Sequence, residues 1–90
     1  MFKILRKTVE LIDFEVKLPI YIHLEDDDNM VHSYLKYDGN CLIEVEWGLH
    51  DVKLFHYNDV NYIQESRLNY IITEEEFEEQ FTEALKIFSK

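Results

Sequence analysis

The chain has a single cysteine, Cys41, so no disulfide can form within it. Disulfides are typical of oxidising compartments, and their absence favours a reducing compartment, the cytoplasm. Only two glycines and one proline occur, which excludes a Gly-rich phosphate loop and a flexible low-complexity linker. No apolar run approaches the roughly 20 residues of a membrane span, and the first residues lack the apolar core of a signal peptide. We expect a cytoplasmic protein that does not enter a membrane.

Basic residues are scarce as well. Nine Lys and Arg stand against nineteen Asp and Glu, which gives a formal net charge of −10. Such a charge repels phosphate backbones and anionic lipid surfaces, so direct binding to nucleic acid or to a membrane is disfavoured. It favours a basic protein partner, or it serves only to keep a small protein soluble.

The apolar content is sufficient for one packed core. Of the 90 residues, 47% are hydrophobic and 14% are aromatic, which excludes a disordered composition. Domains are commonly about 100–200 residues long, so we expect one domain over residues 1–90.

Most of the chain before residue 73 has the two-residue alternation of apolar and polar side chains that is typical of half-buried strands. The expected strands cover residues 12–18, 20–24, 31–37, 41–47 and 49–57. Asp38-Gly39-Asn40 predicts a tight hairpin, because Gly supplies a positive φ angle at no steric cost. On the strand that follows, Trp47 is expected to pack into the core. Residues 1–7 and 60–66 are compatible with either strand or helix.

The last part of the chain predicts an amphipathic helix over about residues 74–89. Thr73 and Glu76 have the spacing of a capping box. Apolar residues then recur on one stripe, which comprises Phe77, Phe81, Ala84, Leu85 and Phe88. The fold class that follows is α+β: a curved antiparallel sheet of about four to six strands, with this helix on one face.

Two acidic clusters stand out. One occupies the start of the helix and the other the turn at residues 25–28. Acidic residues stabilise the N-terminal end of a helix, and Asp is common in turns, so local structure explains much of both clusters. It does not explain Glu75, Glu79 and Glu83, which are like-charged neighbours at i,i+4 spacing and repel one another.

The histidines and the aspartates of the turn suggest a metal site only weakly. Residues 26–29 lack the glycine and the terminal glutamate of an EF-hand loop. His23 and His32 can lie opposite each other beside Glu25 if the two strands form a hairpin. Histidines on a polar strand face remain the favoured interpretation, and we expect no metal site and no cofactor.

No catalytic motif is present. Cys41 shares an apolar strand face, where a buried thiol is usually inert. Ser33, Ser66 and Ser89 lack the G-x-S-x-G context of a nucleophilic serine. The six tyrosines exceed the needs of a small core, and tyrosine is favoured in interfaces as well as in strands. We therefore expect a protein that is not an enzyme.

The leading hypothesis is an acidic binding protein that engages a basic protein. Its sharpest form is a nucleic-acid mimic that inhibits a nuclease or another nucleic-acid-binding protein, as a phage anti-defence protein or an immunity protein would. The alternative is a structural or regulatory module that forms a homodimer or larger homo-oligomer through its sheet, with the charge serving solubility alone. The residues expected to contact the partner are Glu74, Glu75, Glu78, Glu79, Glu83, Glu25, Asp26, Asp27, Asp28, Tyr34 and Tyr37.

Overall fold

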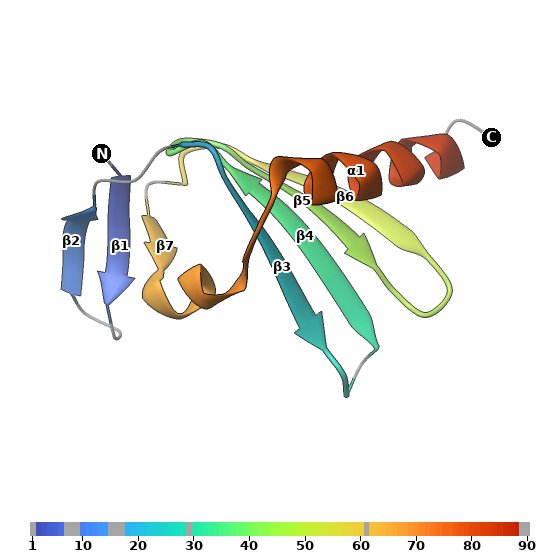
Figure 1. Cartoon of the computed structure of the whole chain (residues 1–90), viewed down its shortest axis with the longest axis horizontal. Helices are drawn as coiled ribbons and strands as arrows, with labels where there is room; N and C mark the ends of the chain where they lie inside the picture. Colours follow the sequence, from blue (N-terminus) through green and yellow to red (C-terminus); the bar gives the residue numbers. More distant parts are fainter. Residues whose placement is uncertain (1, 7–9, 15–17, 29, 61, 89–90) are drawn as a thin grey trace.

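A computed structural model of the chain describes residues 2–6, 10–14, 18–28, 30–60 and 62–88. Its main element is a five-stranded antiparallel sheet in the order β6-β5-β4-β3-β8, and the C-terminal helix α1 lies across one face (Figure 1). The elements of this unit are β3 (Ile20–Asp26), β4 (Val31–Tyr37), β5 (Leu42–Trp47), β6 (Val52–Tyr57), β8 (Ile71–Ile72) and α1 (Glu74–Phe88). This arrangement confirms the predicted α+β class. No helix among the described residues is long and apolar enough to span a membrane.

A second, smaller sheet was not predicted. It has the order β2-β1-β7 and comprises β1 (Phe2–Arg6), β2 (Glu10–Phe14) and β7 (Tyr62–Gln64). The β1–β7 pair is parallel and joins two segments that are far apart in the sequence. The 3-10 helix η1 (Glu65–Tyr70) then leads to β8, so the ambiguous stretch after residue 60 is partly strand and partly helix. Of the strand predicted over residues 12–18, β2 ends at Phe14, and residues 15–17 lie outside the described part.

The turn between β4 and β5 forms where Asp38-Gly39 predicted it. The carboxylate of Asp38 accepts hydrogen bonds from the backbone amides of Cys41, at 2.7 Å, and Asn40, at 2.9 Å. These two bonds hold the pKa of Asp38 below its usual range, since they stabilise the charged form. Gly39 has φ +97°, so a side chain at this position is strained.

Replacing Gly39 with valine is therefore expected to lower the free energy of unfolding by about 1 kcal/mol or more. A Cβ at this position would also lie 2.9 Å from Cδ1 of Leu18. Urea denaturation of the wild type, Gly39→Val and Gly39→Asn measures the effect. Asn tolerates positive φ better than a β-branched residue, so its loss should be smaller. Equal losses for Asn and Val would show that backbone strain is not the cause.

The sheet buries apolar side chains on both faces. On one face, Ile22, Leu35 and Tyr37 pack with Ile63 of β7, and the hydroxyl of Tyr37 donates to the carbonyl of Val60 at 2.8 Å. On the other, α1 covers the sheet: Tyr21, Val45, Phe77 and Ala84 are buried there, and the Tyr21 and Phe77 rings lie 5.4 Å apart. The connection through β7 and η1 is thus the counterpart of α1 on the opposite face.

Only part of the apolar stripe of α1 is buried against the sheet. Phe77 is buried, but Leu85 and Phe88 are 43% and 52% exposed. Ala84 on the same stripe is buried as well, so the stripe packs against the sheet through some of its residues only, and the prediction is wrong for Leu85 and Phe88. Trp47 is partly buried, beside Ile87 of α1, whereas Leu42 and Val45 are the buried residues of β5.

Candidate functional site

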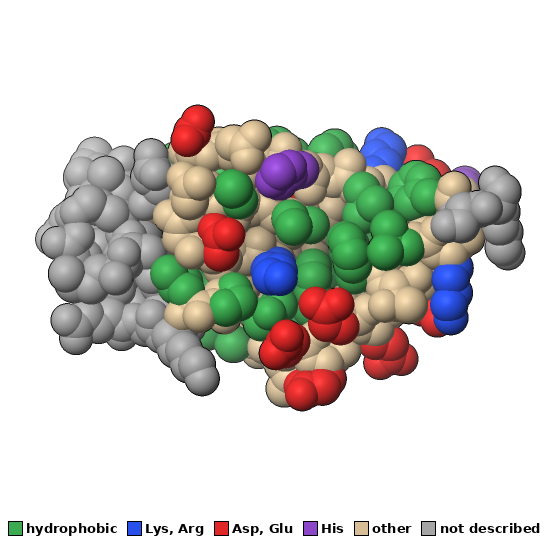
Figure 2. Space-filling view, turned by 90° about the horizontal axis from the view of Figure 1, so that it is seen from above, with side chains coloured by type: hydrophobic (Ala, Val, Ile, Leu, Met, Phe, Trp, Pro, Cys, Tyr) green, Lys and Arg blue, Asp and Glu red, His purple; other side chains and the backbone are tan. Residues whose placement is uncertain are grey.

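The N-terminal half of α1 carries an exposed row of carboxylates. Thr73 caps the helix: its hydroxyl oxygen accepts a hydrogen bond from the amide of Glu76 at 3.2 Å, as the capping pattern predicted. Six glutamates of α1 are exposed, and we define the acidic helix surface as the five that do not take part in the cap: Glu74, Glu75, Glu78, Glu79 and Glu83. In Figure 2, which views the molecule from the helix side, several acidic side chains lie along one margin of this face, next to apolar side chains.

Most of this charge is not neutralised within the described part of the chain. Glu83 pairs with Lys86 at 3.2 Å, and there is no ion pair to the other four glutamates from any described residue. The field of these carboxylates reaches the sheet below. Burial raises the pKa of the Tyr21 hydroxyl, and the carboxylates of Glu74 and Glu78 raise it further.

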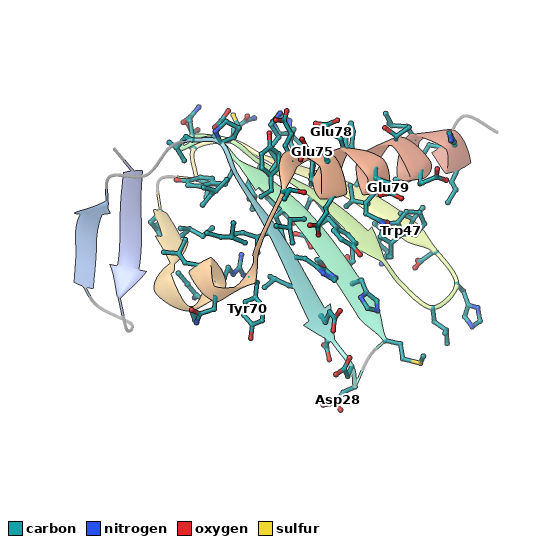
Figure 3. All side chains as sticks on the ribbon, in the orientation of Figure 1. Asp28, Trp47, Tyr70, Glu75, Glu78 and Glu79 are labelled. Carbon is teal, nitrogen blue, oxygen red and sulfur yellow. The ribbon has the colours of Figure 1, made fainter. Side chains whose placement is uncertain are left out.

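The second acidic cluster lies elsewhere. It comprises Glu25 and Asp26 at the end of β3 and Asp27 and Asp28 in the turn, all of them exposed. Figure 3 shows Asp28 at the tip of the β3–β4 hairpin, well away from Glu75, Glu78 and Glu79. The structure therefore does not merge the two clusters into one acidic surface.

The two tyrosines that were predicted to contact the partner differ in their exposure. Tyr34 is partly buried on the helix face of β4; burial raises the pKa of its hydroxyl, and Glu25 and Glu76 raise it further. Tyr37 is fully buried on the opposite face. The prediction that Tyr37 contacts a partner is wrong, because its side chain fills the core.

The β3–β4 hairpin brings two histidines and a glutamate together. In its register, His23 lies opposite Tyr34 and Glu25 opposite His32, and all four side chains share the helix face. Nε2 of His23 is 3.4 Å from Nδ1 of His32, and Oε1 of Glu25 is 3.6 Å from the first atom and 3.7 Å from the second. The histidines are diagonal neighbours, not the directly opposed pair that the sequence suggested. The three residues are evident in the sequence, but whether their side chains lie close together depends on the register of the β3–β4 pair.

A cavity of about 400 Å³ lies on the other side of the molecule, between the main sheet and β7. Tyr37, Leu42, Ile63 and Val60 give it an apolar wall, and Arg67 supplies a cation.

These observations define an acidic α+β protein with one antiparallel sheet, one covering helix and two separate groups of polar side chains. Comparison of the chain with family models, with curated proteins and with solved structures finds no match.

Proposed function

We propose that this is a non-enzymatic binding protein whose acidic helix surface engages a basic protein. The observation that carries the proposal is the row of exposed glutamates, four of which have no ion-pair partner among the described residues. Within one protein such charges repel one another, and the repulsion destabilises the helix. A basic partner would turn this unfavourable arrangement into a favourable one.

The spacing supports a mimic of nucleic acid. Glu75, Glu79 and Glu83 follow one another at intervals of four residues, which is about 6 Å along a helix axis. They form a regular row of negative charges on a rigid support, and Tyr34 adds a partly exposed aromatic ring on the same side of the sheet. A groove that binds a phosphate backbone would accept such a row. The partner in this proposal is a nuclease or another nucleic-acid-binding protein, and the free thiol of Cys41 favours the cytoplasm as the place of action.

The partner is to be found by a pull-down from the cells that express the protein, read by mass spectrometry. A basic nuclease or DNA-binding protein among the captured proteins supports the proposal. Recovery of the protein alone contradicts it.

The decisive test is the triple variant Glu78→Gln, Glu79→Gln and Glu83→Gln. Its folding should be intact, because the changes relieve repulsion between neighbouring carboxylates. Its affinity for the captured partner should fall by about 1–3 kcal/mol, because charge-assisted hydrogen bonds are lost. Calorimetric titration at two salt concentrations measures both effects, and wild-type binding should weaken steeply with salt.

A matched control removes the same charge outside α1. The variant Glu46→Gln, Asp51→Asn and Asp59→Asn should bind almost as well as the wild type. If both triple variants lose affinity equally, only the net charge matters and the helix is not the contact surface. If neither loses affinity, mimicry by this helix is excluded.

A homo-oligomer is the second candidate, and the edge of the sheet favours it. β6 is the outer strand of the main sheet, and Leu54 and Tyr57 on it are 37% and 42% exposed. An uncovered edge strand can pair with a second copy. Light scattering on the purified protein tests this, and a monomer at high concentration excludes it.

A further inference from the structure

We propose that His23, Glu25 and His32 form a binding site for one divalent transition-metal ion of the zinc class. Their three ligand atoms all lie within 4.8 Å of one another, on two adjacent strands. This site uses none of the glutamates of the acidic helix surface. It also departs from the interpretation of the histidines that the sequence favoured.

The geometry of the three atoms matches metal coordination. Zinc holds imidazole nitrogens and carboxylate oxygens at roughly 2.0–2.2 Å. In a tetrahedral site, ligand atoms at that distance lie about 3.3–3.6 Å from one another. The distance between the two ring nitrogens, 3.4 Å, agrees with this value. Glu25 has to move by only a few tenths of an ångström.

Direct hydrogen bonding explains the same distances less well. Hydrogen bonds from nitrogen to oxygen in proteins usually span about 2.7–3.2 Å, and those between charged groups are shorter. The two nitrogen–oxygen separations, 3.6 and 3.7 Å, exceed this range, and the contact between the two ring nitrogens, at 3.4 Å, is long. The three ligand atoms thus lie close together without a short contact between them.

The supporting structure holds the ligands in place. His23 and Glu25 are two residues apart on β3, and His32 pairs with Glu25 across the β3–β4 ladder, so the backbone fixes their spacing. The ring of Tyr34 stacks on that of His23, with centroids 4.3 Å apart and planes 6° from parallel. A ligand held this way loses little conformational freedom when it binds a metal.

Charge and ligand type select the ion. The neighbouring turn carries Asp27 and Asp28, and the whole chain is strongly negative, which favours a cation. Two imidazoles and one carboxylate suit zinc, nickel or copper, whereas calcium and magnesium prefer oxygen ligands. The side chains of His32 and Glu25 are 46% and 52% exposed, so a remaining coordination position can hold water.

Titration of the tag-free protein with zinc chloride, followed by calorimetry, tests the site. We expect one zinc ion per chain, with micromolar affinity or tighter, and no displacement by excess calcium or magnesium. His32→Ala should weaken binding at least about 10-fold, since even the loss of a residue that only hydrogen-bonds to a metal ligand costs that much. Glu25→Gln should weaken it as well. His50→Ala, which removes an exposed histidine outside the cluster, should leave it unchanged.

A second measurement, the NMR signals of the imidazole groups, uses the wild-type protein and so does not depend on whether the variants fold. In the wild type, zinc should shift the signals of His23 and His32 together and leave those of His50 and His56 in place. Cys41→Ser should bind zinc like the wild type. The proposal is overturned if zinc does not bind, if Cys41→Ser abolishes binding, or if His50→Ala weakens it as much as His32→Ala.

Discussion

Replacing Phe77 with alanine is expected to lower the free energy of unfolding by about 3–5 kcal/mol. Phe77 is 2% exposed, and its ring lies 5.4 Å from that of Tyr21 and 5.7 Å from that of Phe81. Phe77 is the only apolar residue in the first turn and a half of α1, and it joins this part of the helix to the main sheet. Its replacement by alanine therefore leaves a cavity at this contact. Urea denaturation followed by circular dichroism measures the change.

Phe88→Ala is the matched control on the same helix. Phe88 is 52% exposed, so its replacement should change the stability by only about 0.5 kcal/mol. If the two variants lose equal stability, α1 does not rest on the sheet through its N-terminal half. The position of the acidic helix surface would then have to be revised.

Tyr37→Ala is expected to have a similarly large effect on the opposite face, on the order of 3–5 kcal/mol as for other buried aromatic residues. Tyr37 is fully buried, and its hydroxyl donates to the carbonyl of Val60 in the segment that leads to β7. Tyr37→Phe keeps the ring and removes only the donor. It should cost about 1–3 kcal/mol, the penalty of an unpaired polar group in a buried position.

The difference between the two Tyr37 variants separates packing from hydrogen bonding. Denaturation of both, with the wild type as reference, gives the two contributions. A Tyr37→Phe variant as stable as the wild type would mean that water satisfies the carbonyl of Val60. A stable Tyr37→Ala variant would contradict the assignment of Tyr37 to the core.

Local signals in the sequence were sufficient for the hairpin at Gly39 and for the helix that Thr73 caps. Both depend on interactions within a few residues: a positive φ angle in one case and a side-chain bond to a nearby amide in the other. The alternation of apolar residues likewise predicted the strands of the main sheet, because each strand has two faces whose side chains alternate. The α+β class follows from these elements.

Tertiary structure alone decided which apolar residues are buried. The sequence pattern around Tyr37 is compatible with either an exposed or a buried side chain. Tyr37 is buried because the segment around Val60 and Ile63 covers its face of the sheet. Phe88 continues the apolar stripe of α1, yet it is 52% exposed, whereas Ala84 on the same stripe is buried. The parallel pairing of β1 with β7 is also a contact between distant segments, for which no local pattern exists.

For the histidine cluster, too, the sequence determined one part and the tertiary structure the other. The sequence by itself determined that two histidines and a glutamate fall on neighbouring strands around an acidic turn. Whether they meet depended on the register of the β3–β4 pair, since a slip of one residue turns every side chain to the other face. That register is set by packing on both faces of the sheet: Ile22 and Leu35 must reach one core while Tyr21 reaches Phe77. Burial of distant residues thus fixes the separation of three polar groups, and for this reason only the tertiary structure could place them around one point.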